Sequence, residues 1–244
     1  MADQQADLQA AMKNKKEQLA AIYGVYSSWV ENFPLACEKG CAACCTQSVT
    51  MTSLEGEVLL DFLKVQGLDN RLPGLLAQRT PGNKGAAITT NQYANACLEH
   101  RHVSEDGLGG WNFAPCVFLN EGACSIYEVR PFGCRSFGSF VRCSENSGAE
   151  IAPIHLTVNT VFTQIIEHVC SDGGYWGNMA DILEDLIADE APDKKGNLLP
   201  AQPVPGFLLE PNEVKVVHVL LRQLYEQSAE KQTFGDLIDN FMPI

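Results

Sequence analysis

The sequence is short of positive charge. Its 244 residues carry 17 Lys and Arg against 30 Asp and Glu, which gives a net charge of -13. Because such an excess repels phosphate backbones and anionic lipid heads, we expect neither nucleic acid nor a membrane as a partner. No apolar run approaches the roughly 18 residues that span a bilayer, and the longest patch, from Glu57 to Leu63, is interrupted by charge.

The opening segment, MADQQADLQAAMKNKKEQLAA, lacks the basic start, apolar stretch and small-residue cleavage site of a signal peptide. We therefore expect a soluble, cytoplasmic protein. The chain has 10 cysteines, an even number that would suggest disulfides in a secreted protein. In a reducing cytosol metal ligation is the better interpretation.

The cysteines are clustered. Four of them, Cys37, Cys41, Cys44 and Cys45, lie in one short segment, and crowded thiolates repel unless a cation neutralises them. The side chains of adjacent residues usually diverge, so Cys44 and Cys45 would more easily serve different metal atoms, which favours a polynuclear centre. Further along the chain are Cys116, Cys124, Cys134 and Cys143. We expect the first seven of these eight to converge in one pocket, whereas Cys143 either completes a set of eight ligands or is a free loop thiol.

Apolar residues make up 45% of the chain, enough for a core, and their spacing predicts a mainly α fold in a single domain, 1–244. Helices are expected at 4–32, 91–99, 157–170, 176–189 and 211–229, and another from a capping box at Thr52 and Glu55 to a stop at Gly67. The segment CVFLNEGACSIY, 116–127, predicts a β-hairpin that turns at 120–122. The expected architecture is a helical domain with a small β-hairpin and irregular loops, in which a metal-binding core, 37–143, lies between terminal helices.

Two segments carry a family resemblance: GCAACC at 40–45, with Glu55 beyond it, and CVFLNEGACSIYEVRPFGCR at 116–135. Together they resemble the CxxCxxCC cysteine-cluster family, to which zinc or iron chelation is ascribed and to which flagellin lysine N-methylase is distantly related. The resemblance spans about residues 37 to 143, although Cys37 and Cys41 are separated by three residues where the pattern has two. It implies a cysteine-ligated metal centre and a methyl-transfer-like modifying activity.

Arg130 and Arg135 flank Cys134, and we expect them to bind the cofactor by offsetting the negative charge of a thiolate-ligated centre, the alternative being plain surface arginines. Seven or eight thiols exceed the four ligands of one zinc ion and suit either a cluster with supporting ligands or two metals that share one pocket. We expect an iron-sulfur cluster, with zinc as the alternative. The expected function is a cysteine-ligated metal-binding protein with a redox or modifying activity on an unknown protein or small molecule. The alternatives are a closed zinc module that stabilises an interaction scaffold and a simple electron carrier.

Of three other patterns, the last two are interpreted as incidental. The CxxxCxxC spacing of Cys37, Cys41 and Cys44 matches radical S-adenosylmethionine enzymes, but the helical pattern lacks their repeated βα units, and Ala43 replaces the usual aromatic residue. We therefore reject membership of that superfamily, while its cluster chemistry stays open. Cys97 and His100 have ligand-like CxxH spacing on a predicted helix, and GLGG at 107–110 predicts a turn. Cys170 is expected in the core, and structural roles are expected for three histidines, His155, His168 and His218.

Overall fold

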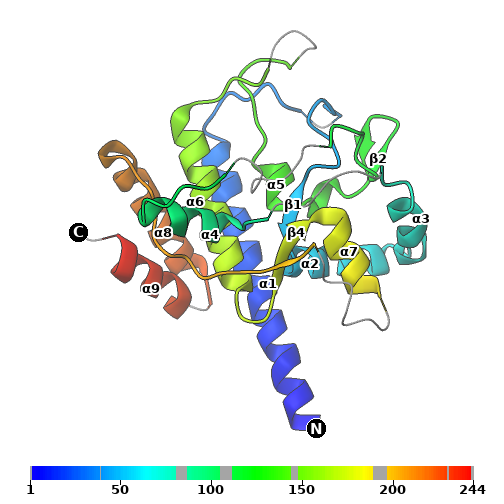
Figure 1. Cartoon of the computed structure of the whole chain (residues 1–244), viewed down its shortest axis with the longest axis horizontal. Coiled ribbons are helices and arrows are strands. Elements are labelled where there is room, and N and C mark those ends of the chain that lie inside the picture. The colour runs from blue at the N-terminus through cyan, green and yellow to red at the C-terminus, as the bar shows by residue number, and fades with distance from the viewer. Residues whose placement is uncertain are drawn as a thin grey trace.

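The computed structural model describes residues 2–38, 40–80, 87–104, 112–143, 148–188, 197–229 and 231–242. Helices make up 56% of the structure, which confirms the expected mainly α fold (Figure 1). Of the helices in these ranges, none is both long and apolar enough to cross a bilayer. The turn predicted at 107–110 lies outside the described residues.

The elements follow in chain order. The helices are α1 (Ala2–Val30), α2 (Ser53–Val65), α3 (Leu72–Leu76), α4 (Thr90–Leu98), α5 (Phe132–Arg135), α6 (Pro153–Cys170), α7 (Met179–Ile187), α8 (Pro211–Gln227) and α9 (Lys231–Phe241). The strands are β1 (Thr50–Thr52), β2 (Leu119–Asn120), β3 (Ala123–Cys124), β4 (Tyr175–Asn178) and β5 (Leu199–Pro200). Short 3-10 helices occur at η1 (Asp69–Arg71) and η3 (Tyr127–Val129).

The predicted capping box begins α2. The Thr52 side chain accepts a hydrogen bond from the Glu55 backbone N–H, and the Glu55 carboxylate accepts one from the Thr52 backbone N–H. The helix ends where predicted, because Gly67 adopts a φ of 66° and Leu68 N donates to Leu63 O at 2.8 Å. This is the hydrogen bond that closes a Schellman motif.

The predicted helix at 176–189 is wrong in its first turn. Residues Tyr175–Asn178 form β4, which pairs antiparallel with β1 on one side and with β5 on the other. Helix α7 begins only after Asn178, whose side chain accepts a hydrogen bond from Ala180 N, and the predicted last residue lies outside the described ranges. The start of α7 is set by strand pairing between segments that are distant in the sequence. Local periodicity carries no information about such pairing.

Two clusters of buried side chains hold the helices together. The first joins α1, α6, α8 and α9, with Ile22, Ile165 and Leu224 fully enclosed. The second joins α2, α3, α7 and the β2–β3 hairpin, with Leu59 and Leu183 among its members. The short helix α5 lies at their junction, since Phe132 belongs to the first cluster and Cys134 packs against the second.

The loops that carry the clustered cysteines lie at one end of the molecule (Figure 1). Figure 1 shows the first turns of α1 extending away from the body, while its other end leads into a loop that crosses toward the β2–β3 hairpin. That loop carries the first four cysteines. The fold therefore brings the two cysteine-rich segments to the same side of the helical body.

Candidate metal centre

The first cysteine segment is a chain of tight turns. Cys41 N donates to Glu38 O and Cys45 N donates to Ala42 O, both at 3.0 Å. Gly40 adopts a φ of 99°, a conformation that favours glycine because it has no Cβ. The four thiols of this segment line the same cavity.

Backbone pairing joins this segment to the second one. Cys116 N donates to Cys45 O at 2.9 Å, and Gln47 N donates to Ala114 O at 3.0 Å. These two bonds flank an antiparallel bridge between Thr46 and Pro115. The backbones of Cys45 and Cys116 are thus fixed side by side although they are distant in the sequence.

The predicted hairpin is confirmed and positions Cys124. Leu119 pairs with Cys124 and Asn120 with Ala123, so the turn consists of Glu121 and Gly122, one residue shorter than predicted. Both turn residues have positive φ, 49° and 79°, as a type I′ turn requires. Phe118, on the chain leading into β2, is buried and anchors the hairpin to the second cluster.

Helix α5 positions Cys134 through a buried carboxylate. Glu55 is only 4% exposed, and its Oε1 accepts hydrogen bonds from Phe132 N and from the Tyr23 hydroxyl, both at 2.7 Å. One side chain of α2 therefore holds α1 and the first turn of α5. Sequence analysis identified Glu55 as a capping residue and as part of the family resemblance. It did not predict these contacts, because Tyr23 and Phe132 are distant from Glu55 in the sequence.

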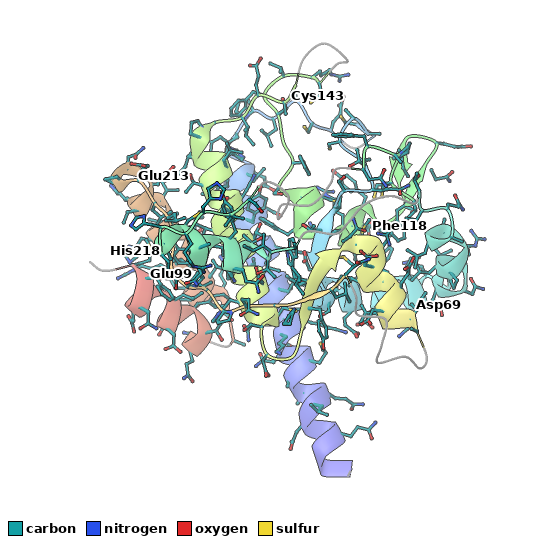
Figure 2. All side chains as sticks on the ribbon, in the orientation of Figure 1. Asp69, Glu99, Phe118, Cys143, Glu213 and His218 are labelled. Atoms are coloured by element: carbon teal, nitrogen blue, oxygen red, sulfur yellow. The ribbon has the colours of Figure 1, made fainter. Side chains whose placement is uncertain are left out.

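Seven cysteines line one cavity of about 230 Å³, which we call the thiol pocket. Its cysteines are Cys37, Cys41, Cys44, Cys45, Cys116, Cys124 and Cys134. This confirms the prediction that the two segments converge. Cys143, labelled near the edge of the molecule in Figure 2, lies instead in a neighbouring cavity of about 320 Å³ together with Cys37 and Cys41.

The seven cysteines share a cavity, but their side chains are not arranged to bind a metal ion. Among the side chains in the described ranges, no group of three or more His, Cys, Asp or Glu is arranged so that it could hold a metal ion. All ten cysteines are free thiols rather than disulfides. The donor set is that of a thiophilic metal, whereas the present orientation of the sulfur atoms is not that of a metal centre.

Burial and crowding favour the protonated form of Cys44 and Cys134. Burial raises the pKa of Cys44 to about 11, and the neighbouring Cys45 and Cys41 contribute to the rise. Burial, followed by Cys116 and Cys124, raises the pKa of Cys134 far above its ordinary value. A metal ion entering the pocket must displace these protons, since the thiolate is the ligating form.

Both predicted arginines line the thiol pocket and are held in place. Arg135 donates from Nε to Arg130 O at 2.8 Å and from Nη2 to Glu128 O at 2.6 Å, and its guanidinium lies 4.3 Å from the centre of the Tyr23 ring. The Arg130 guanidinium lies 3.8 Å from the centre of the Tyr127 ring. Two positive charges are thereby fixed beside the thiols, although burial lowers the pKa of Arg135.

The CxxH pair has a local structural explanation. His100 has a φ of 55°, and Arg101 N donates to Ala96 O at 2.8 Å, so the pair marks the end of α4. Neither Cys97 nor His100 belongs to the lining of the two cysteine cavities. Cys170 is 2% exposed within the first cluster, as expected for a core residue.

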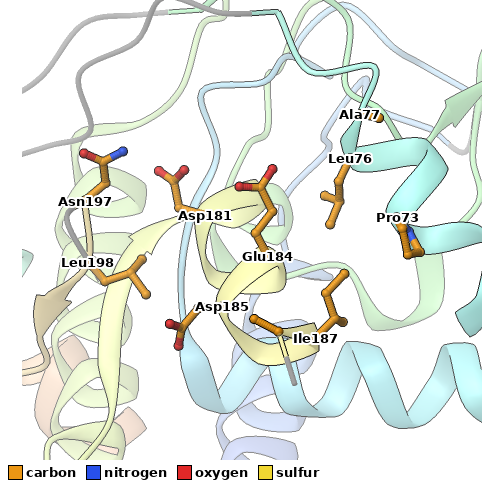
Figure 3. Close-up of a pocket in the computed structure, with 10 residues that line it drawn as sticks. Pro73, Leu76, Ala77, Asp181, Glu184, Asp185, Ile187, Asn197 and Leu198 are labelled. Atoms are coloured by element: carbon orange, nitrogen blue, oxygen red, sulfur yellow. The ribbon is translucent and has the colours of Figure 1, made fainter. Parts of the chain in front are cut away.

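Another cavity, of about 460 Å³, lies between α3 and α7 and is acidic rather than thiol-lined. Figure 3 shows Leu76 and Pro73 on one side and the carboxylates of Asp181 and Glu184 on the other. Arg79 forms ion pairs with both carboxylates. These acids therefore have a counter-charge from the chain itself.

No family model, curated protein or solved structure matches this chain. Its fold and site define a mainly α protein in which two distant cysteine-rich segments enclose one pocket. The resemblance to the cysteine-cluster family stays a prediction from the sequence.

Proposed function

We propose that this chain binds a metal centre through the cysteine sulfurs of the thiol pocket, as an iron-sulfur cluster with zinc as the alternative. The observation that carries the proposal is that seven cysteines from two distant segments of the chain line one cavity of about 230 Å³. Sulfur ligands are those that iron-sulfur clusters and zinc share. Seven thiols exceed what one tetrahedral zinc ion uses, and they suit a cluster with supporting ligands or more than one metal ion.

Metal binding on this proposal draws the thiols inward. Rotation of the cysteine side chains is the smallest change that would bring sulfur atoms to a common point, since the backbones of Cys45 and Cys116 are already paired. The bound cation offsets the thiolate charge, and Arg130 and Arg135 at the pocket wall offset what remains. Free thiols throughout suit a reducing compartment, so we propose a cytoplasmic location.

The residues of the pocket wall other than cysteine favour a redox or modifying activity at this centre over a closed structural module. Besides thiols and arginines, the pocket is lined by apolar side chains, including Leu35, Ile126 and Met179. A mixed apolar and cationic wall beside a metal could receive part of a small molecule or a protein side chain. A closed zinc module or a simple electron carrier requires no such space.

The test is metal and sulfide analysis of the full-length chain purified without oxygen. We expect a brown protein with iron and acid-labile sulfide, and loss of both in Cys124→Ser. The matched control is Cys97→Ser, which changes a cysteine outside the pocket and should retain them. Stoichiometric zinc without sulfide would replace iron in the proposal, whereas a chain that holds no metal after anaerobic reconstitution would refute it.

A further inference from the structure

The second cysteine cavity has its own construction. It lies between the first cysteine loop and the segment after α5, and its three thiols are Cys37, Cys41 and Cys143. Ala36 N donates to Ser139 O at 2.7 Å, and Glu38 and Arg142 form an ion pair. Two contacts thus hold Cys143 opposite the Cys37 loop, independently of the hairpin.

Four of the other five pocket thiols are held by different contacts. Cys45 and Cys116 share a backbone hydrogen bond, Cys124 belongs to the β2–β3 hairpin, and Cys134 lies on α5. These four are partly buried, as is Cys143, whereas Cys37, Cys41 and Cys44 are exposed to solvent. Four sulfurs complete a tetrahedral site and three leave a position open.

We propose that the cysteines form two metal sites, an inner one of Cys45, Cys116, Cys124 and Cys134 and an outer, open one of Cys37, Cys41 and Cys143. The outer site takes a thiophilic divalent ion such as Zn²⁺ or Cd²⁺, whose fourth position is filled by water or by an incoming ligand. Cys44 lies at the junction, beside both Cys45 and Cys41. This inference rests on the proposed metal-binding function and adds a second, more accessible site to it.

The order in which a chelator removes the two metal ions should distinguish the two sites. The inner ion is enclosed by a complete sulfur set, while the outer ion is held by fewer ligands and faces solvent. A chelator should therefore remove the outer ion first and the inner ion later.

The experiment is a Cd²⁺ titration of the reduced full-length chain, followed by thiolate-to-metal absorption and by native mass spectrometry. We expect about two Cd²⁺ per chain, bound in a tight and a weaker step. Cys143→Ser should weaken only the second step, by about tenfold or more. Cys124→Ser should weaken the first, and Cys97→Ser should change neither.

Two results would overturn the two-site proposal while leaving metal binding intact: a single Cd²⁺ per chain, or two Cd²⁺ that Cys143→Ser binds as tightly as the unmodified chain does. Because Cys143 lies in a loop outside both buried clusters, this variant is expected to fold even if Cys124→Ser does not. A chain that binds no Cd²⁺ at all would instead refute the proposed function itself.

Discussion

Glu55 connects more of the site than any local pattern suggests. Its carboxylate accepts hydrogen bonds from the Tyr23 hydroxyl, Phe132 N, Thr52 N and the Thr52 hydroxyl. On folding, each of these donors loses its hydrogen bond to water and therefore needs an acceptor within the protein. The residue therefore stabilises the fold and sets the position of α5, which carries Cys134.

Replacing Glu55 with alanine should lower the free energy of unfolding by about 3–5 kcal/mol, because it leaves several buried donors without an acceptor. Chemical denaturation of the full chain measures this loss. The control is Glu57→Ala on the same helix, which removes a 3.7 Å surface ion pair with Lys16 and should cost less than about 1 kcal/mol. Equal losses for the two variants would contradict the role assigned to Glu55.

His155 is a second residue whose buried environment affects the stability of the fold. It is 1% exposed, and within the described part of the chain neither ring nitrogen has a hydrogen-bond partner. The rings of Trp29 and Phe33 lie against it, with centroids 4.6 and 4.2 Å away. Burial lowers the pKa of His155, so the imidazole is neutral in the folded protein at pH 7.

The folded state disfavours protonated His155, whereas the unfolded chain takes up that proton near pH 6.5. The contribution of His155 to the free energy of unfolding is therefore constant above about pH 6.5 and declines as the pH falls below that value. His155→Phe should remove this decline and raise the free energy of unfolding at pH 7 by about 1 kcal/mol, because an unsatisfied polar ring is replaced by an apolar one.

Urea denaturation of both proteins at pH 7 and pH 5.5 checks the His155 prediction. Some pH dependence should persist in the variant, since burial also lowers the pKa of His168. A variant less stable than the parent at pH 7 would show that the ring nitrogens contribute to the fold.

At the scale of elements, the site depends on how closely α5 approaches β1. Gly133 permits this approach, because a Cβ there would lie 2.9 Å from Thr50 O and 3.3 Å from Val49 Cγ1. A backbone oxygen cannot move aside as a flexible side chain can. The adjacent Cys134 therefore owes its place in the thiol pocket partly to a residue that has no side chain.

Gly133→Ala should push α5 away from β1, lower the free energy of unfolding by about 1–3 kcal/mol and weaken metal retention. Denaturation and metal content of the same preparations measure both effects. Gly74→Ala in α3 is the control, since a Cβ there meets nothing within 4 Å and should be neutral or slightly stabilising. Unchanged stability in Gly133→Ala would mean that the close contact relaxes at little cost.

At the scale of the whole molecule, the helices and the cysteine loops depend on different interactions. The first cluster is built from helix faces that bury one another, whereas residues 40–45 and 112–118 have only a few backbone hydrogen bonds. A metal centre would supply the missing cross-links among these loops. Stability should therefore divide between a metal-independent helical body and metal-dependent loops.

Metal removal from the purified holo chain should increase hydrogen exchange first at 37–45 and 116–143, while α1, α6 and α8 keep their protection. Exchange followed by mass spectrometry, before and after verified chelation, measures this difference. Unchanged protection of the cysteine segments would contradict the division, as would simultaneous loss across the helices.

Local chemistry in the sequence determined the helical content, the capping box at Thr52 and Glu55, the hairpin and the grouping of the cysteines. Each of these depends on residues a few positions apart, whose periodicity or turn preference is visible in one segment. The same information predicted that seven thiols would meet, because crowded thiolates need a common cation.

Only the tertiary structure decided what joins distant segments. It converted Tyr175–Asn178 into a strand by pairing it with β1 and β5, and it placed Glu55 under both Tyr23 and Phe132. It also placed Cys143 in a neighbouring cavity together with Cys37 and Cys41. The physical reason is the same in each case: the free energy of these contacts comes from partners far along the chain, and such partners leave no periodic signal in the sequence.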